Sequence, residues 1–319
     1  MANKIRVKSF LENTGVINLQ MRLVAGKAGI DREIRVGDIN RPGLTLAGFY
    51  DFFAYDRIQI FGLGENAFLK KLSDEKRKEV LEIFFSYDVL CCIFTHNEEP
   101  DPLFIEYADK KGVPVLITEK DTTKFTSSLI YLLNEAFAPT VTLHGTFVDV
   151  YGIGVVIMGK SGVGKSECAL ELVERGHRII ADDMVMVKRI DESILMGSGS
   201  PMLRHHMEIR GLGIINVKEL FGIRSVRDRK RVELMVMLEE WEQNKLYDRL
   251  GLEEQKFPIL DIEVPSITVP VRPGRNIPII VETAALNQRL KKLGIFSARN
   301  LDENIQEHLK RENIQNDGA

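Results

Sequence analysis

The chain contains little cysteine, with only three among its 319 residues. Cys91 and Cys92 are adjacent and Cys168 stands alone, so the sequence shows neither a disulfide framework nor the spacing of a zinc site. Unpaired cysteines favour a reducing compartment, because disulfides are rare there. We therefore expect a cytoplasmic protein.

Long apolar runs and an excess of one charge are also lacking. No run approaches the roughly 20 apolar residues that cross a bilayer, and the N-terminus has no secretory apolar region. The 43 Lys and Arg residues against 46 Asp and Glu residues leave a net charge of −3, without the basic excess of general nucleic-acid binders. The sequence predicts neither a membrane nor a nucleic acid as partner.

The length predicts two domains, residues 1–138 and 139–319, and the 44% hydrophobic content is enough for well-packed cores. Alternating strand-like and helix-like segments predict an α/β fold. Pro139 marks the boundary, because proline limits the continuation of the preceding helix.

In the first domain, a helix-like segment at residues 102–111 ends at Gly112 and is followed by the strand-like residues 115–117, which is typical of α/β folds. This half lacks a phosphate loop, a metal-ligand cluster and a nucleophile arrangement in its sequence, so we expect it to serve scaffolding, assembly or regulation.

The most informative motif is the phosphate-binding pattern G-x-x-x-x-G-K-[ST]. It consists of Gly159, Lys160, Ser161, Gly162, Val163, Gly164, Lys165 and Ser166. An apolar, strand-like run precedes it and good helix formers follow it up to a capping position at Gly176, which is the context such a loop needs. The motif predicts a polyphosphate site in which Lys165 contacts phosphates and Ser166 binds Mg²⁺. The alternative is a glycine-rich turn without a ligand.

Two aspartates, Asp182 and Asp183, end the next apolar run only 16 positions after Ser166. We expect this run and the strand before the loop to form one compact βαβ unit, with the carboxylates at the edge of the sheet where ligands bind. One carboxylate could support a metal and the other accept a proton. The alternative is that the two aspartates only form a turn or cap the N-terminus of a helix. Glu208 is a candidate for a further Mg²⁺ ligand.

A basic cluster follows at Arg224, Arg227 and residues 229–231. We interpret it as a solvated loop before a strand at residues 232–238, or as a contact with an acidic neighbouring subunit.

Taken in order, the motifs resemble those of the HPr kinase/phosphorylase family over almost all of residues 141–296. The segments that carry the resemblance are residues 143–145, 148–152, 159–166, 171–178, 182–183, 208–216, 238–241, 248–251 and 267–276. The N-terminal half is a weaker match, mainly at residues 41–44.

The resemblance implies a bifunctional enzyme acting on a serine of the phosphocarrier protein HPr, with a role in carbon catabolite regulation. It would phosphorylate the serine with ATP or pyrophosphate and remove the phosphate by phosphorolysis, in which inorganic phosphate becomes pyrophosphate. The resemblance also implies a catalytic core like that of phosphoenolpyruvate carboxykinase, and a homohexamer.

The resemblance further implies roles for single residues. His144, Lys165, Asp183 and Arg249 would be catalytic, with Asp183 taking the proton from the serine. Ser166 and Glu208 would hold Mg²⁺. The segment from Met207 to Asn216 would be a further part of the site, and the segment from Pro270 to Arg275 would serve dephosphorylation.

Lys160 departs from the family pattern, because many relatives carry an acidic residue there. Its charge favours a polyphosphate or simply faces water. Two other functions remain open: a small-molecule kinase of the phosphoenolpyruvate-carboxykinase type, and a nucleotide-regulated binding switch that transfers no phosphate.

Overall fold

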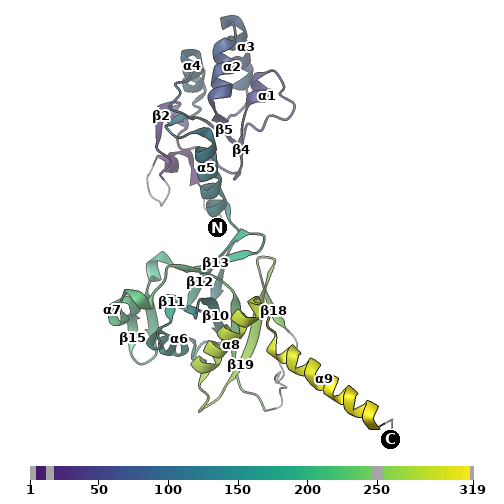
Figure 1. The fold of residues 1–319 in the computed structure, drawn as a ribbon. Coiled ribbons are helices and arrows are strands. Elements are labelled where there is room, and N and C mark those ends of the chain that lie inside the picture. The colour runs from purple at the N-terminus through teal and green to yellow at the C-terminus, as the bar shows by residue number, and fades with distance from the viewer. Residues whose placement is uncertain (1–4, 12–17, 244, 246, 248–253, 317–319) are drawn as a thin grey trace. The chain divides into compact units, whose positions relative to one another are not determined.

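The structure is a computed structural model, and it describes residues 5–11, 18–243, 245, 247 and 254–316 (Figure 1). The chain divides into two compact units, Met1–Ala138 and Pro139–Ala319, and both contain helices and strands. Among the described helices, none has the length and apolar character needed to cross a membrane.

The N-terminal unit is built on a five-stranded sheet of order β2-β7-β6-β5-β4. Neighbouring strands from β4 to β7 run parallel, and β2 pairs with β7 in the antiparallel direction. The strands of this unit are β1 (Ile5–Arg6), β2 (Met21–Ala25), β3 (Glu33–Ile34), β4 (Ile39–Asn40), β5 (Ile58–Phe61), β6 (Cys91–Phe94) and β7 (Val115–Thr118). The helices are η1 (Val7–Phe10), η2 (Lys27–Gly29), α1 (Gly43–Leu46), α2 (Leu63–Lys71), α3 (Asp74–Phe84), α4 (Pro102–Lys111) and α5 (Thr122–Phe137).

Side chains alternate between the two faces of this sheet, as the twofold period of a strand requires. Phe61 and Phe94 pack with α1 to α4 on one face, and Ile60 and Ile93 pack with α5 on the other. The segment from α4 to β7 is confirmed, including the left-handed residue Gly112 at φ 61° that ends α4. Glycine adopts this conformation without a Cβ clash.

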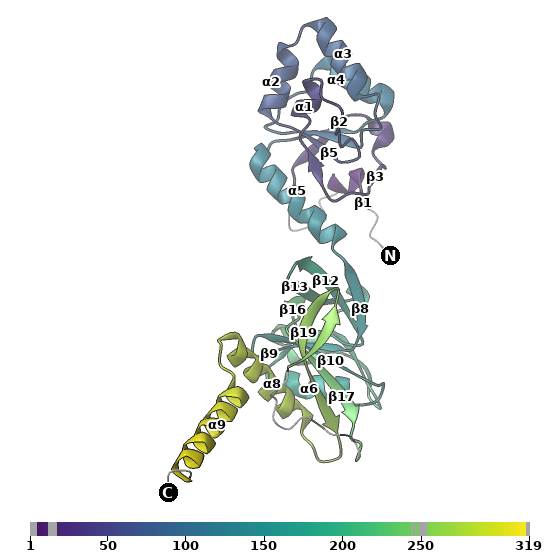
Figure 2. The same ribbon diagram turned by 90° about the vertical axis from the view of Figure 1, so that its right-hand side faces the viewer.

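The C-terminal unit has three layers. A six-stranded sheet of order β11-β9-β10-β17-β19-β18 is covered on one face by α6 and α8 and on the other by a four-stranded sheet of order β16-β13-β12-β8 (Figures 1 and 2). The strands are β8 (Thr140–His144), β9 (Thr146–Val150), β10 (Ile153–Gly159), β11 (Arg178–Ala181), β12 (Met184–Asp191), β13 (Ile194–Gly199), β14 (His206–Ile209), β15 (Gly213–Asn216), β16 (Arg229–Arg231), β17 (Leu234–Glu240), β18 (Gln255–Ile259) and β19 (Ile262–Val271). The helices are α6 (Lys165–Glu174), η3 (Pro201–Leu203), α7 (Val217–Phe221), η4 (Ile223–Ser225), α8 (Ile277–Lys292) and α9 (Ser297–Asn316).

The strands on either side of the phosphate loop differ from our expectation in one respect. The strand, loop and helix are present as β10, residues 160–164 and α6, but β11 does not pair with β10. Instead β9 lies between them and is antiparallel to both. β10 and β11 are thus parallel strands of one βαβ unit, as expected, but β9, which precedes β10 in the chain, lies between them.

The basic cluster also differs in part from the expected loop. Arg229–Arg231 forms the short strand β16, which pairs with β13, and the strand after it is β17. The side chain of Arg227 pairs with the buried Asp149 at 2.7 Å. One basic group of the cluster thus serves the internal structure of the unit.

Candidate functional site

The phosphate loop lies between the end of β10 and the start of α6, on the carboxyl edge of the parallel strands β10, β17 and β19. Gly162 and Gly164 have φ angles of 85° and 98°, which a residue with a side chain rarely adopts. Gly164 directly precedes α6, so the loop turns the backbone amides of the first helical turn toward the site. This is the arrangement in which a helix N-terminus attracts an anion.

Lys165 is buried, and its Nζ atom donates hydrogen bonds of 3.1 Å to the carbonyl oxygens of Gly159 and Lys160. These bonds hold the ammonium group against the loop. Lys160 itself is exposed, so its charge lies at the surface of the loop.

Asp182 is the centre of a hydrogen-bond network behind the loop. The hydroxyl of Ser166 lies 3.0 and 3.1 Å from its two carboxylate oxygens, and the Oγ1 atom of Thr146 donates to Oδ1 at 2.6 Å. The backbone N–H groups of Asp183 and Glu208 also donate to this carboxylate. Asp182 therefore joins the loop, β9 and β14 at one point.

Burial raises the pKa of Asp182 above its usual value, and the four hydrogen bonds oppose this effect only in part. The carboxylate lies in a site that disfavours an isolated negative charge. A cation bound beside it would remove this disadvantage.

Asp183 has a positive φ of 66°, a conformation that Asp adopts more often than most residues but still at a cost in energy. Its carbonyl accepts a hydrogen bond from the N–H of Gly145 at 3.0 Å. As a result, its carboxylate turns toward His144 at the end of β8, with 3.1 Å between Nδ1 and Oδ1. Both side chains are mostly exposed, at 61% and 63%, so an incoming molecule can reach them.

The hairpin of β14 and β15 brings two further charged residues to the site. Glu208 lies on β14, and Arg210 follows in the turn, where its guanidinium donates to the hydroxyl of Ser161 at 3.1 Å. A Cβ atom at Gly162 would lie only 2.7 Å from the same guanidinium, so the loop and the turn approach closely because residue 162 is glycine.

These groups line one pocket of about 120 Å³. Its lining residues are His144, Ser161, Gly162, Gly164, Lys165, Ser166, Glu167, Asp182, Asp183, Glu208 and Arg210. The structure therefore brings together most of the residues that the sequence singled out, from positions 144 to 210.

One predicted segment lies outside the pocket. The segment from Pro270 to Arg275 begins at the end of β19, two strands from β10 on the same carboxyl edge, and Arg275 donates to the carbonyl of Pro270 at 3.0 Å. It does not line the pocket. Arg249 lies outside the described residues.

The donors at the pocket fit Mg²⁺. This ion prefers oxygen ligands and in phosphate sites commonly takes one or two carboxylates, with phosphate oxygens and water completing its shell. Ser166, Asp182 and Glu208 present one hydroxyl and two carboxylates to the same pocket, and burial disfavours the charge on Asp182 in the absence of a cation. Within the described residues, no group of three or more His, Cys, Asp and Glu side chains could hold a metal ion by itself.

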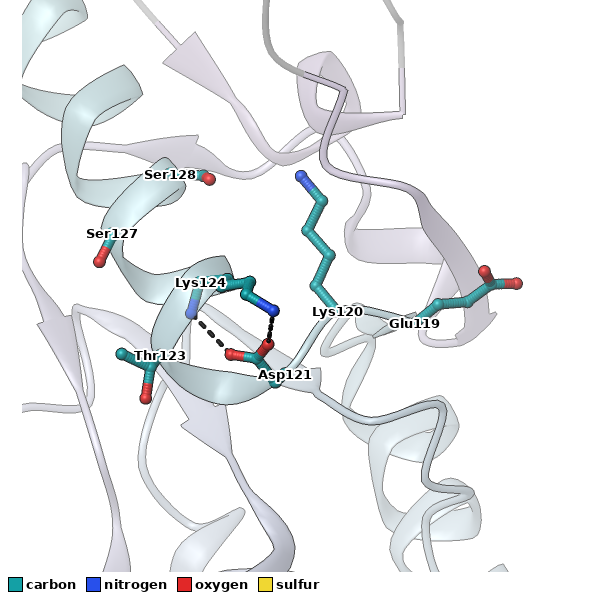
Figure 3. Close-up of a pocket in the computed structure, with 7 residues that line it drawn as sticks. All are labelled: Glu119, Lys120, Asp121, Thr123, Lys124, Ser127 and Ser128. Carbon is teal, nitrogen blue, oxygen red and sulfur yellow. Dashed lines mark hydrogen bonds and ion pairs between the residues drawn. The ribbon is translucent and has the colours of Figure 1, made fainter.

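A larger pocket, of about 630 Å³, lies in the N-terminal unit at the start of α5 (Figure 3). Asp121 caps this helix by accepting from the N–H of Lys124 at 2.8 Å, and it also pairs with the Lys124 ammonium at 3.0 Å. Lys120 donates to the carbonyl of Asn18 at 2.6 Å. Because local structural contacts use these groups, the size of this pocket does not make it the better candidate for chemistry.

Sequence reasoning did not assign Asp182 a definite role and missed Thr146 altogether. The sequence did indicate Asp182 as a candidate, because it belongs to a pair of aspartates that ends an apolar run. Thr146 carried no signal, because its partner Asp182 lies 36 positions away and only the pairing of β9 with β11 brings the two together.

Two family models cover nearly the whole chain. Residues 5–133 match the model described as HPr Serine kinase N terminus, and residues 135–305 match the HPr Serine kinase C-terminal domain. The chain belongs to the HPr kinase/phosphorylase family.

Relatives named HPr kinase/phosphorylase support this assignment over more than 90% of their length. The chain is 51% identical over 300 residues to the protein of Leptospira biflexa, with 93% of each chain covered. It is 50% identical over 289 residues to the protein of Treponema pallidum, which covers 90% of this chain and 91% of the relative. It is 47% identical over 302 residues to the protein of Caldanaerobacter subterraneus, which covers 95% of this chain and 97% of the relative. Among solved structures, the Hpr(Ser) kinase/phosphatase from Coxiella burnetii is 36% identical, with a TM-score of 0.45 over 50% of this chain and 98% of that chain.

Proposed function

We propose that this protein is a bifunctional kinase and phosphorylase of HPr. It transfers a phosphoryl group to a serine of HPr and removes it again. The family assignment over both units carries this proposal. The pocket that joins the phosphate loop to Asp182, Asp183 and Glu208 supports it, because phosphoryl transfer needs positioned charges more than a covalent intermediate.

In the kinase direction, the loop amides and Lys165 bind the phosphates of ATP or pyrophosphate. Asp183 accepts the proton as the serine oxygen attacks the terminal phosphorus, and ADP or inorganic phosphate leaves. His144 orients the Asp183 carboxylate through the 3.1 Å contact. Both groups lie at the exposed side of the pocket, which suits an acceptor carried on another protein.

In the phosphorylase direction, an oxygen of inorganic phosphate attacks the phosphorus of phosphoserine. The serine oxygen leaves and receives a proton from Asp183, and pyrophosphate forms. We place the segment from Pro270 to Arg275 in this direction, and its position on the carboxyl edge of the sheet supports the assignment. Arg249 stays a proposed catalytic residue on the family resemblance alone.

Ser166, Asp182 and Glu208 would hold Mg²⁺. The bound ion supplies charge neutralisation for the phosphate oxygens. Thr146 keeps the Asp182 carboxylate in place, and Arg210 holds the turn of the hairpin against Ser161.

We further propose a catalytic core related to phosphoenolpyruvate carboxykinase, supported by the phosphate loop on a mixed sheet and the short distance in sequence from Ser166 to Asp182. We assign assembly or regulation to residues 1–138 and catalysis to residues 139–319, in a homohexamer. The three free cysteines, all buried, agree with a reducing cytoplasm. There the enzyme would act in carbon catabolite regulation.

Transfer of label from ATP to purified HPr, followed by addition of inorganic phosphate, tests both directions. We expect phosphoserine first and pyrophosphate release afterwards. Asp183→Asn should lower the transfer rate by roughly 10³-fold, which corresponds to about 4 kcal/mol, while ATP binding persists. Near-normal transfer by this variant would refute the role of Asp183 as the base.

The same assay separates the two other functions. Phosphorylation of a metabolite but not of HPr would indicate a small-molecule kinase. Tight ATP binding without transfer to any acceptor would indicate a binding switch.

A further inference from the structure

An unusual apolar surface lies beside the candidate active site. Four large side chains between positions 212 and 223 are between 63% and 75% exposed, namely Leu212, Ile214, Leu220 and Ile223. They belong to the β14–β15 hairpin, α7 and η4, which contact one another in sequence order, and α7 and β15 lie side by side in Figure 1. We call these four residues the hairpin–α7 surface.

The hairpin–α7 surface is continuous with the pocket. Ile214 is the partner of Glu208 in the register of the hairpin, so both side chains stand on the same face of the two strands, about 5 Å apart at Cβ. Met207 and Ile215 occupy the opposite face, which packs on the core of the unit. A molecule that contacts Ile214 therefore also lies next to the pocket mouth formed by Glu208 and Arg210.

Grouped apolar exposure of this kind commonly marks an interaction site in a folded protein. The hydrophobic core does not need these side chains, because α7 and η4 are anchored through the buried residues Val217 and Ser225. The Ser225 hydroxyl lies 2.7 Å from the Gly222 carbonyl oxygen, which fixes the turn between the two helices.

The charges around this surface indicate the chemistry of its partner. On α7 and η4, the exposed charged residues are Lys218, Glu219 and Arg224. Arg224, next to Ile223, is exposed. Lys218 and Arg224 beside these apolar side chains favour a partner whose own apolar patch has acidic groups at its border, and they speed the encounter at low salt.

We propose that the hairpin–α7 surface docks the acceptor protein, contacting an apolar patch with an acidic border next to the serine that is phosphorylated. This inference rests on the proposed function. The pocket, at about 120 Å³, has room for little more than the reacting groups, so recognition of a folded acceptor has to take place outside it. The hairpin–α7 surface is contiguous with the mouth through which the serine must enter.

The double variant Leu220→Ser and Ile223→Ser tests the proposal in the full-length protein. Both side chains lie outside the pocket and are mostly exposed, so we expect the urea midpoint of unfolding to stay at its wild-type value. Leu293→Ser is the matched control, because Leu293 is 71% exposed at the end of α8 and belongs to neither the pocket nor the hairpin–α7 surface.

We expect the KM for HPr to rise at least tenfold, or about 1.4 kcal/mol, while kcat and the Kd for ATP stay within about twofold. A serine-containing peptide too short to reach α7 should be phosphorylated equally by the wild type and the double variant. Arg224→Glu should raise the same KM and weaken its dependence on salt. The Leu293→Ser control should match the wild type.

An unchanged KM for HPr in the double variant would overturn the docking surface while leaving the proposed function intact. A change in the mass of the double variant in solution, together with lost activity, would also overturn it and identify the surface as a contact between copies of this chain. If the wild type transfers no phosphate to HPr, the proposed function itself fails and the docking surface fails with it.

Discussion

The Thr146→Val substitution tests whether the network around Asp182 supports metal-dependent transfer. Thr146 is fully buried on β9, and its hydroxyl donates to Asp182 at 2.6 Å. Valine has nearly the same shape and favours strands, so β9 should form as before. The substitution therefore removes one hydrogen-bond donor and little else.

The expected magnitude follows from the surroundings of Asp182. The carboxylate accepts from four donors, and valine removes the shortest of the three side-chain contacts. A hydrogen bond to a charged group contributes about 1.5–3 kcal/mol, so the free energy of unfolding should fall by an amount in this range. Because Asp182 also holds Ser166, we expect the Mg²⁺ concentration for half-maximal transfer to rise about tenfold, or about 1.4 kcal/mol.

Urea denaturation measures the first effect, and titration of phosphoryl transfer with Mg²⁺ measures the second. Thr146→Ser keeps the hydroxyl and should restore the Mg²⁺ dependence, even where the lost methyl group lowers stability slightly. A Thr146→Val protein with both wild-type stability and wild-type Mg²⁺ dependence would refute our account of the network.

Three further substitutions test other contacts. Gly162→Ala should weaken ATP binding in an equilibrium titration. The Cβ atom of the alanine would displace the Arg210 guanidinium, and a φ of 85° strains a residue that has a side chain. An unchanged affinity for ATP would contradict this prediction. Burial raises the pKa of the Cys168 thiol to about 12, so between about pH 9 and 12 unfolding releases a proton from this thiol. The free energy of unfolding should therefore fall by about 1.4 kcal/mol per pH unit in this range. Cys168→Ala should make the fall less steep in denaturation curves, and an unchanged pH dependence would argue against the raised pKa. Arg227→Ala should lower the free energy of unfolding by about 1–3 kcal/mol, because it leaves the buried carboxylate of Asp149 without its ion-pair partner, whereas wild-type stability would show the pair to be dispensable.

Local patterns in the sequence were sufficient to predict many helices and strands and the phosphate loop. Helix α4 with its glycine end, the strand β7 after it, and the strand–loop–helix around Gly162 and Gly164 follow from residues close together in the chain. Backbone conformation and capping depend on such neighbours, and the family resemblance rests on motifs of the same kind.

The sequence by itself thus determined a phosphate loop, two carboxylates placed after a strand, and a family with known chemistry. Only the tertiary structure decided that β9 separates β10 from β11, that Thr146 supports Asp182, and that Ile214 stands beside Glu208 at the pocket mouth. The first two depend on the pairing of β9 with β11, which lie far apart in the chain, whereas Ile214 and Glu208 face each other within one hairpin. The register of β9 and β11 depends on which apolar faces pack together, and no short stretch of residues encodes that choice.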